Sequence, residues 1–125
     1  MNHHVEVGDL PLFPVGPAGS DARIFNGGQH GFPETSLMLG TLLPGEGPAM
    51  HQHPYGEAFA ISEGLARFTI DGETVEAGPD RVVFVPSGVP HDFINAGTGV
   101  LRIVAVHAAP KVEIEWLEEP WMPGR

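Results

Sequence analysis

An all-β fold of the sandwich or barrel type is what the sequence predicts, on three observations. The chain has 125 residues, enough for one packed core and too few for a second domain of ordinary size. Its 17 glycines and 13 prolines fall at short intervals between runs of β-type residues. About nine or ten such runs follow one another, and no helical stripe of useful length interrupts them.

The expected elements follow the chain in order. Residues 1–22 hold several prolines and glycines and are predicted to form an extended or partly disordered arm. The predicted strands between residues 22 and 110 are 22–26, 35–43, 49–53, 57–63, 65–70, 73–77, 81–85, 91–95 and 100–107. Asp71-Gly72 predicts a type I′ hairpin between two of them. In the tail, 111–125, the segment 112–116 alternates apolar residues with glutamates, which favours an edge strand or a dimer contact.

Two of these strands carry predictions about burial. The segment 81–85 is rich in valine and is expected to be buried. In 100–107, Arg102 should face water, which places Val104 and Val106 on its face. The opposite, inward face then consists of Leu101, Ile103, Ala105 and His107.

Composition excludes several classes of function. Without cysteine the chain has neither disulfides nor thiolate ligands, so any metal must be held by histidines and carboxylates. The formal charge of −10 and the lack of a Lys/Arg cluster argue against nucleic acid as a partner. The apolar stretches are too short to cross a membrane. No charged-then-apolar leader opens the sequence, so we expect a cytoplasmic location.

Four residues form a candidate metal site. His51 and His53 are two residues apart on a predicted strand, so their side chains leave the same face. Glu57 has the same parity, and His91 opens another strand directly after a turn. Three imidazoles and one carboxylate suit a divalent first-row metal and leave coordination positions open. A histidine pair alone would be a weak signal.

The spacing of these residues is more specific. Gly45, five residues, His51-x-His53, three residues, Glu57, six residues, Gly64 resembles in full the first motif of the cupin superfamily. Downstream, Pro86-x-Gly88, two residues, His91, three residues, Asn95 resembles the body of the second cupin motif. The resemblance is dense over residues 45–95 and looser over the flanking strands. The first glycine of the second motif is replaced by Asp80, at a turn that we expect to survive because Asp tolerates left-handed backbone.

What the resemblance implies can be written residue by residue. The fold would be a double-stranded β-helix, or jelly roll, with a single cupin domain at 23–110. His51, His53, Glu57 and His91 would hold one divalent transition metal, with Fe, Mn, Ni, Co, Cu and Zn all admissible. Gly45, Gly64 and Gly88 would be turn residues, and Asn95 a structural polar group near a strand end.

Three residues are candidates for a catalytic role. Glu57 would be a ligand and, on detaching, a base. His107 would reach inward near the mouth of the barrel, although a strand-end histidine can also be merely half exposed. Tyr55 lies in the loop between ligands and could donate a hydrogen bond to bound substrate. His30, in a glycine-rich loop, and the apolar Met38, Phe59, Ile61, Phe68 and Phe93 have core or loop roles as the simpler interpretation.

Function is less determined than fold, because the cupin scaffold carries many activities. The first hypothesis is a metal-dependent enzyme of the quercetinase-like group with dioxygenase-type chemistry on a small organic molecule. The alternatives are a non-catalytic small-ligand binding protein, or an isomerase or epimerase. We also expect a homodimer, since the outer face of 100–107 carries two valines and the tail holds Trp116 and Trp121.

Overall fold

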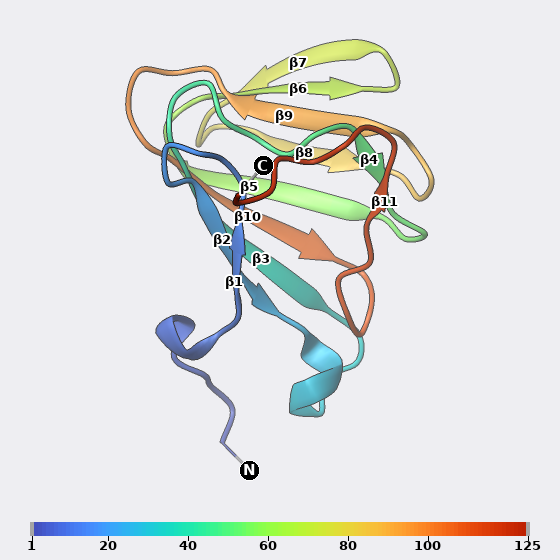
Figure 1. Ribbon diagram of the computed structural model, residues 1–125. Coiled ribbons are helices and arrows are strands. Elements are labelled where there is room, and N and C mark those ends of the chain that lie inside the picture. The colour runs from blue at the N-terminus through green and yellow to red at the C-terminus, as the bar shows by residue number, and fades with distance from the viewer. Residues whose placement is uncertain (1, 125) are drawn as a thin grey trace.

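Strands follow one another along nearly the whole described chain, residues 2–124 of the computed structural model (Figure 1). The strands are β1 (Leu12–Pro14), β2 (Asp21–Phe25), β3 (Ser36–Leu42), β4 (His51–Gln52), β5 (Glu57–Glu63), β6 (Ala66–Ile70), β7 (Glu73–Ala77), β8 (Val82–Val85), β9 (His91–Asn95), β10 (Leu101–His107) and β11 (Glu115–Trp116). Two 3₁₀ turns, η1 (Val7–Asp9) and η2 (Gly27–His30), are the helical segments of this part of the chain. Within residues 2–124 no helix is long and apolar enough to cross a membrane.

The strands form two antiparallel sheets that face each other (Figure 1). The six-stranded sheet has the order β1-β2-β3-β10-β5-β8, and the five-stranded sheet the order β11-β4-β9-β6-β7. Chain neighbours such as β3 and β4 therefore lie in different sheets, while β10 returns to lie between β3 and β5. This crossing between sheets brings residues that are far apart in sequence to the same end of the barrel.

The core lies between the sheets and follows the two-residue alternation of the strands. In β10 the buried residues alternate with exposed or half-buried ones, as predicted from Arg102. Phe59, Phe68 and Phe93 come from three different strands and pack with ring centroids 5.0 to 5.5 Å apart. They fill the part of the barrel interior next to the four predicted metal ligands, with the Phe59 ring 6.2 Å from that of His91.

The turns agree with the sequence prediction in most places. Asp71 and Gly72 have φ of 49° and 80°, as a type I′ hairpin between β6 and β7 requires. Gly45, Gly64 and Gly88 also have positive φ, so the three motif glycines are turn residues. The turn before β8 forms, with the Arg81 amide donating to the Gly78 carbonyl at 3.2 Å, but Asp80 does not adopt the left-handed backbone.

Two expectations about segments differ in part from the structure. The prediction that 81–85 is buried holds only for Val83 and Val85, because β8 is the edge of its sheet and exposes Val82 and Phe84 at 69% and 70%. Part of the arm 1–22 is a strand: Leu12–Pro14 pair with β2 and extend the six-stranded sheet. The tail forms the expected edge strand, β11, and the half-buried Trp116 packs its ring over His51 and stacks it on Phe13. The tail thus closes one end of the barrel.

Candidate metal centre

Strand register brings the four predicted ligands to one end of the barrel. His51 in β4 is the direct cross-strand partner of His91 in β9. On the opposite sheet, Glu57 at the start of β5 is paired with His107 at the end of β10. All five of these side chains, counting His53 just after β4, are buried, with exposures of 6% or less. A cluster of five buried polar groups needs internal partners, since water cannot serve them.

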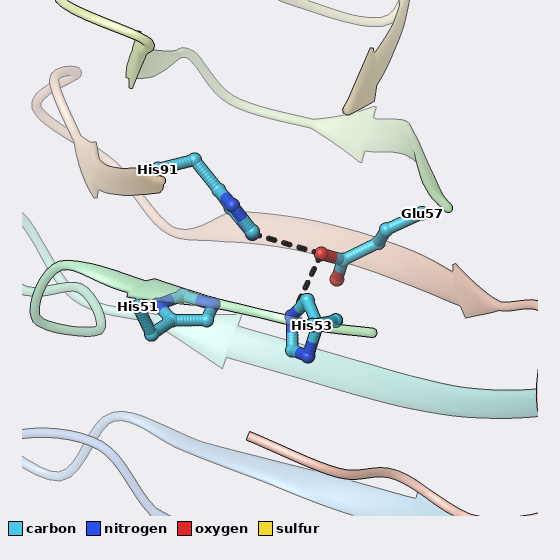
Figure 2. A group of neighbouring side chains, drawn as sticks. All are labelled: His51, His53, Glu57 and His91. Atoms are coloured by element: carbon cyan, nitrogen blue, oxygen red, sulfur yellow. Dashed lines mark hydrogen bonds and ion pairs between the residues drawn. The ribbon is translucent and has the colours of Figure 1, made fainter. Parts of the chain in front are cut away.

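The Glu57 carboxylate lies at the centre of this cluster (Figure 2). Its Oε1 is 2.9 Å from Nε2 of His91 and 3.0 Å from Nε2 of His53. Its Oε2 is 3.0 Å from Nε2 of His107. The His51 ring stands beside them, with its centroid 4.3 Å from that of His91 and 4.9 Å from that of His53.

The Nδ1 atoms of three rings face backbone carbonyls. Nδ1 of His51 lies 2.7 Å from the Ala49 carbonyl, and Nδ1 of His91 lies 2.9 Å from the Val89 carbonyl. Nδ1 of His53 lies 2.5 Å from the carbonyl of Glu113 in the tail. A carbonyl only accepts, so each Nδ1 carries the proton, and in the neutral ring the lone pair is on Nε2.

This tautomer makes the cluster a good host for a cation. Three Nε2 lone pairs and a carboxylate converge, and without a cation or bound protons they would repel one another. Nε2 of His53 is buried and has no well-aligned hydrogen bond, although Glu57 is near. The donor atoms of His51, His53, Glu57 and His91 all lie within 4.8 Å of one another, so these residues could hold a metal ion. Neutral imidazoles and one carboxylate fit a divalent transition metal.

His107 differs from the other three histidines in what its Nδ1 faces. That atom lies 2.6 Å from the Tyr55 hydroxyl, which can donate a proton where a carbonyl cannot. The Tyr55 oxygen in turn accepts from the Glu113 amide at 3.0 Å. If Tyr55 donates to Nδ1, the neutral ring places its N–H on Nε2, toward the Glu57 Oε2 acceptor. Nε2 of His107, like that of His53, is buried and has no well-aligned hydrogen bond although Glu57 is near.

Burial and charge shift the proton affinities of these groups. Burial lowers the pKa of His51 to about 4, so this ring is neutral near pH 7. Burial alone would raise the pKa of Glu57, but contacts with His107, His53 and His91 outweigh it and hold that pKa well below its usual range. For His53, burial acts to lower the pKa and the Glu57 carboxylate more than offsets it, so the pKa is raised. Burial raises the pKa of the Tyr55 phenol to about 12, which keeps it a donor.

The cluster opens onto a small apolar cavity of about 50 Å³. Its polar lining consists of His51, His53, Glu57 and His107. The remaining walls are apolar or glycine, and they come from the sheets, from β1 and from the tail: Phe13, Val15, Ala22, Met38, Gly40, Leu42, Pro48, Phe59, Phe93, Ile103, Ala105, Ile114 and Trp116. No lysine or arginine is among the described residues of this lining.

The residues that line the cavity from the two chain ends were missed by the sequence reasoning. Phe13, Ile114 and Trp116 lie in segments that were interpreted as an arm and a tail. No sequence motif surrounds these residues, so the sequence did not indicate that they line the site. Only the strand pairings of β1 with β2 and of β11 with β4 bring them there. Of the residues considered at sequence level, His30 lies elsewhere and stacks on Phe25 with centroids 4.8 Å apart.

Comparison with known proteins identifies the family. The profile of the family described as "Cupin domain" matches residues 38–107, more than half of the chain. The chain belongs to the cupin family. The resemblance seen in the two motifs is therefore confirmed, and so is the jelly-roll arrangement of the two sheets in this cupin.

Curated relatives of this cupin come from Streptomyces species and from Salmonella and Escherichia coli. The polyketide synthase CurC of Streptomyces cyaneus is 36% identical over 75 residues, which are 59% of this chain and 48% of that protein. The tetracenomycin polyketide synthase protein TcmJ of Streptomyces glaucescens is 30% identical over 95 residues, or 72% of this chain and 64% of TcmJ. The mannose-1-phosphate guanylyltransferase ManC of Salmonella typhimurium is 31% identical over 74 residues, only 15% of that protein. The cupin thus spans about half of CurC and a small part of ManC.

Solved structures show the same fold at low sequence identity. One is the oxalate decarboxylase of Bacillus subtilis, in a study of its Mn(II) centres, with a TM-score of 0.74 and 22% identity over 84% of this cupin and 30% of that chain. Another is the polyketide cyclase RemF of Streptomyces resistomycificus, with a TM-score of 0.74 and 20% identity. RemF matches over 95% of this cupin and 87% of its own chain. At these identities the likeness concerns the fold.

Proposed function

We propose that this cupin is a metal-dependent enzyme that acts on a small enolic or phenolic molecule, with dioxygenase-type chemistry as the first candidate. One observation carries the proposal: a buried set of three histidines and one carboxylate opens directly onto an apolar cavity. Catalytic sites commonly combine a few convergent polar groups with apolar walls, and this cavity of about 50 Å³ would have to widen to admit an organic substrate. A metal held by the four residues would supply Lewis-acid polarisation of a chelating oxygen and open positions for water or substrate.

Glu57 has two roles in this proposal. Its lowered pKa keeps the carboxylate ionised, so Oε1 is available as a ligand atom between His53 and His91. When Oε1 is released, the same atom can accept the proton of an enolic or phenolic hydroxyl. The apolar walls exclude water from that transfer and strengthen the electrostatic interactions inside the cavity.

We assign His107 and Tyr55 as positioning residues that act through Glu57. The expectation that Tyr55 donates to substrate is replaced by a different role, because its hydroxyl is engaged by His107 and Glu113 and it is not among the cavity-lining residues. The chain from Tyr55 through His107 ends at Glu57 Oε2. It orients the carboxylate so that Oε1 faces the ligand histidines, as outer hydrogen bonds do at other metal sites.

The walls of the cavity favour an uncharged or metal-chelating substrate. A phosphorylated substrate would need arginine or lysine near the site, and the described lining has neither. Arg67 and Arg102 point outward and pair with Glu76 and Glu63 at 3.7 and 3.4 Å. This disfavours the sugar phosphate for which the guanylyltransferase relatives are named, and favours the polyketide class named for CurC, TcmJ and RemF. Poly-β-ketones and phenols of that class present chelating oxygens.

The test is a screen for oxygen uptake. Tag-free protein loaded with Fe, Mn, Ni or Co would be mixed with flavonols, β-diketones and catechols in an oxygen electrode, with Mn first because the oxalate decarboxylase study describes Mn(II) centres. We expect oxygen consumption with at least one pair, abolished by His53→Ala. The matched control is His30→Ala, which removes a histidine remote from the site. No uptake by any metal form would reject the dioxygenase assignment.

A non-oxidative cyclisation is the second candidate. It is favoured by RemF, a polyketide cyclase whose fold matches nearly the whole chain. The cavity of about 50 Å³ would then have to widen to hold a poly-β-ketone, while Glu57 accepts the proton of the attacking carbon. Conversion of a β-diketone or triketone without oxygen uptake would support this candidate, while a ligand that raises the melting temperature without turnover would indicate a binding protein.

Several expectations stay predictions at this point. The quercetinase-like subgroup, the identity of the metal, the cytoplasmic location and the absence of nucleic-acid partners are among them. We also propose that the cupin acts as a homodimer.

A further inference from the structure

The cavity at the metal centre is too small for an organic substrate, so one of its walls has to move before a substrate enters. Its volume is about 50 Å³, whereas pockets for small molecules commonly measure roughly 300–1,000 Å³. The walls come from the two sheets, from the N-terminal arm, from the loop between β3 and β4, and from the tail. The contacts of each wall show which of them can move.

The sheet walls are held by long strand pairings. Phe59, Leu42 and Ile103 line the cavity from three neighbouring strands and are buried, with exposures of 4% or less. The strand β10 pairs with β3 along its whole length and with β5 along nearly all of it. Displacing these strands would break a ladder of hydrogen bonds and expose core side chains to water. We therefore expect the sheet walls to stay in place.

The arm and the loop between β3 and β4 are tied together through Glu46. Its carboxylate accepts hydrogen bonds from the Ala18 amide at 2.8 Å and from the Ser20 hydroxyl at 2.5 Å. Its carbonyl accepts from the Asn95 amide in β9 at 2.9 Å. The arm residue Phe13 lies in β1, which pairs with β2. These contacts fix the arm and the loop to both sheets.

The first part of the tail is anchored at the metal centre. The Val112 amide donates to the side-chain oxygen of Asn26 at 2.8 Å. Glu113 then contacts His53 through its carbonyl and Tyr55 through its amide. A hinge directly after Glu113 would leave all these contacts unchanged, and with them the orientation of the predicted ligand His53.

The next part of the tail, residues 114–118, is held more lightly. Its strand β11 is two residues long and lies at the edge of its sheet, beside the equally short β4 (Figure 1). After β11, the amides of Leu117 and Glu118 both donate to the Met50 carbonyl, at 2.9 and 3.2 Å. The Leu117 side chain is 45% exposed. Segments with short pairings and exposed side chains open at the lowest cost in free energy.

Trp116 closes the seam between this part of the tail and the arm. In the described chain β1 and β11 are edge strands of different sheets and are not paired with each other. Their side chains meet instead, because Trp116 stacks on Phe13 with centroids 6.4 Å apart and planes inclined by 11°. The Trp116 ring also lies over His51, with centroids 5.3 Å apart. Two stacked faces separate without breaking a hydrogen bond, and either face can then stack on a planar ligand.

We propose that the seam between β1 and β11 is the substrate entrance of this cupin, opened when residues 114–118 move outward from a hinge at Glu113. Trp116 is then a specificity-determining residue. Its indole closes the cavity at rest and, once displaced, stacks on a planar enolic or phenolic ring beside His51. The nature of that ligand rests on the proposed function, whereas the entrance itself can be tested on the metal-free chain.

A disulfide that locks the tail tests the entrance without metal or substrate. Gln52 and Glu115 are direct cross-strand partners whose side chains touch at 2.8 Å, so Gln52→Cys/Glu115→Cys should cross-link in this cysteine-free chain. Diethyl pyrocarbonate acylates accessible neutral imidazoles, and peptide mapping by mass spectrometry gives a rate for each histidine. We expect the lock to slow the modification of His51 and His53 at least about tenfold. The exposed His30 should react at an unchanged rate.

Two variants control for side effects of the lock. Gln52→Ser/Glu115→Ser changes the same positions without a cross-link, and its His51 should react at least as fast as in the wild type. The disulfide of Arg67→Cys/Glu76→Cys joins another exposed cross-strand pair, on β6 and β7, and should not slow His51. If the tail lock leaves the His51 rate unchanged, or the control disulfide slows it equally, the entrance lies elsewhere and the proposal is overturned.

Substitution of Trp116 tests its role in closure and selection. Trp116→Ala should raise the modification rate of His51 at least about tenfold, while Leu117→Ala, which shortens an exposed side chain of the same segment, should not change it. In metal-loaded protein, the planar chelating phenol 4-nitrocatechol should bind about tenfold more weakly to Trp116→Ala than to Trp116→Phe, which keeps a stacking face. Equal affinities would refute the stacking role. If the lock slows His51 but 4-nitrocatechol binds to no form, the entrance is supported and the phenolic substrate of the proposed function is rejected.

Discussion

The two halves of the barrel are built on the same strands yet differ completely in character. In β5, Glu57 is followed two residues later by Phe59, and in β9, His91 is followed two residues later by Phe93. Both pairs point inward, and moving one inward position along the strand replaces a predicted metal ligand by an aromatic ring. The ring of Phe59 even packs edge-on against that of His91, with centroids 6.2 Å apart. The aromatic half provides stability that does not depend on the polar half, whose buried groups need a cation or protons.

The largest expected effect is a loss of folding stability when a ring of the aromatic half is removed. Phe68→Ala removes a fully buried ring from the aromatic trio and should lower the free energy of unfolding by about 3–5 kcal/mol. Urea unfolding of the metal-free protein measures this. Arg67→Ala, the next residue on the outer face, is the control and should change it by less than about 0.5 kcal/mol. Equal losses would show that the aromatic half does not dominate stability.

The next effect concerns metal affinity in the polar half. His91→Ala removes one of the Nε2 atoms that face Glu57 and should weaken metal binding at least about a hundredfold, which corresponds to ~2.7 kcal/mol. Competition with a chelator of known affinity gives the number. His30→Ala should bind like the wild type. Unchanged affinity in His91→Ala would remove this residue from the ligand set.

A smaller effect should follow from the residues behind the carboxylate. Tyr55→Phe removes the hydroxyl that contacts His107 and should weaken metal binding about tenfold, the lower end of what outer hydrogen bonds contribute. The electron paramagnetic resonance spectrum of the Mn- or Cu-loaded variant should change as well, because the orientation of Glu57 is relaxed. An unaltered spectrum with unaltered affinity would mean that Tyr55 only fills space.

The smallest effect is a change in pH dependence. His51 has a pKa lowered to about 4 in the folded chain, against 6.5 for an ordinary histidine. The unfolded chain therefore binds more protons between these values, and stability is lost as the pH falls from 6.5 toward 4. From pH 6.5 to 5.5 this amounts to about 1 kcal/mol. In metal-free His51→Gln, the free energy of unfolding should no longer lose this amount between pH 6.5 and 5.5. The opposite contribution of His53, whose pKa is raised, should remain. If the pH dependence of the unfolding free energy is unchanged in this variant, groups other than His51 cause it.

Sequence reasoning predicted the cluster of four residues that could hold a metal, because local spacing encodes it. The interval from His51 to Glu57 fixes which residues share a face, and Gly45, Gly64 and Gly88 mark turns through their positive φ. Orientation of the ligands could not be predicted in this way. It depends on the Glu113 carbonyl, sixty residues from His53, and on strand pairings across two sheets. The exposure of Val82 and Phe84 was missed for a related reason, since a valine-rich run reads the same at an edge as in the middle of a sheet.

Glu113 contributes to the site through its backbone and not through its side chain. Its carbonyl holds His53 and its amide holds Tyr55, so both contributions come from the peptide backbone, while its own carboxylate lies outside beside Lys111. Replacing the side chain at this position therefore leaves the backbone contacts to His53 and Tyr55 in place. Proline is the exception, because it lacks the amide hydrogen that Tyr55 receives. A position can thus orient two side chains of the candidate metal site and still look neutral to alanine scanning.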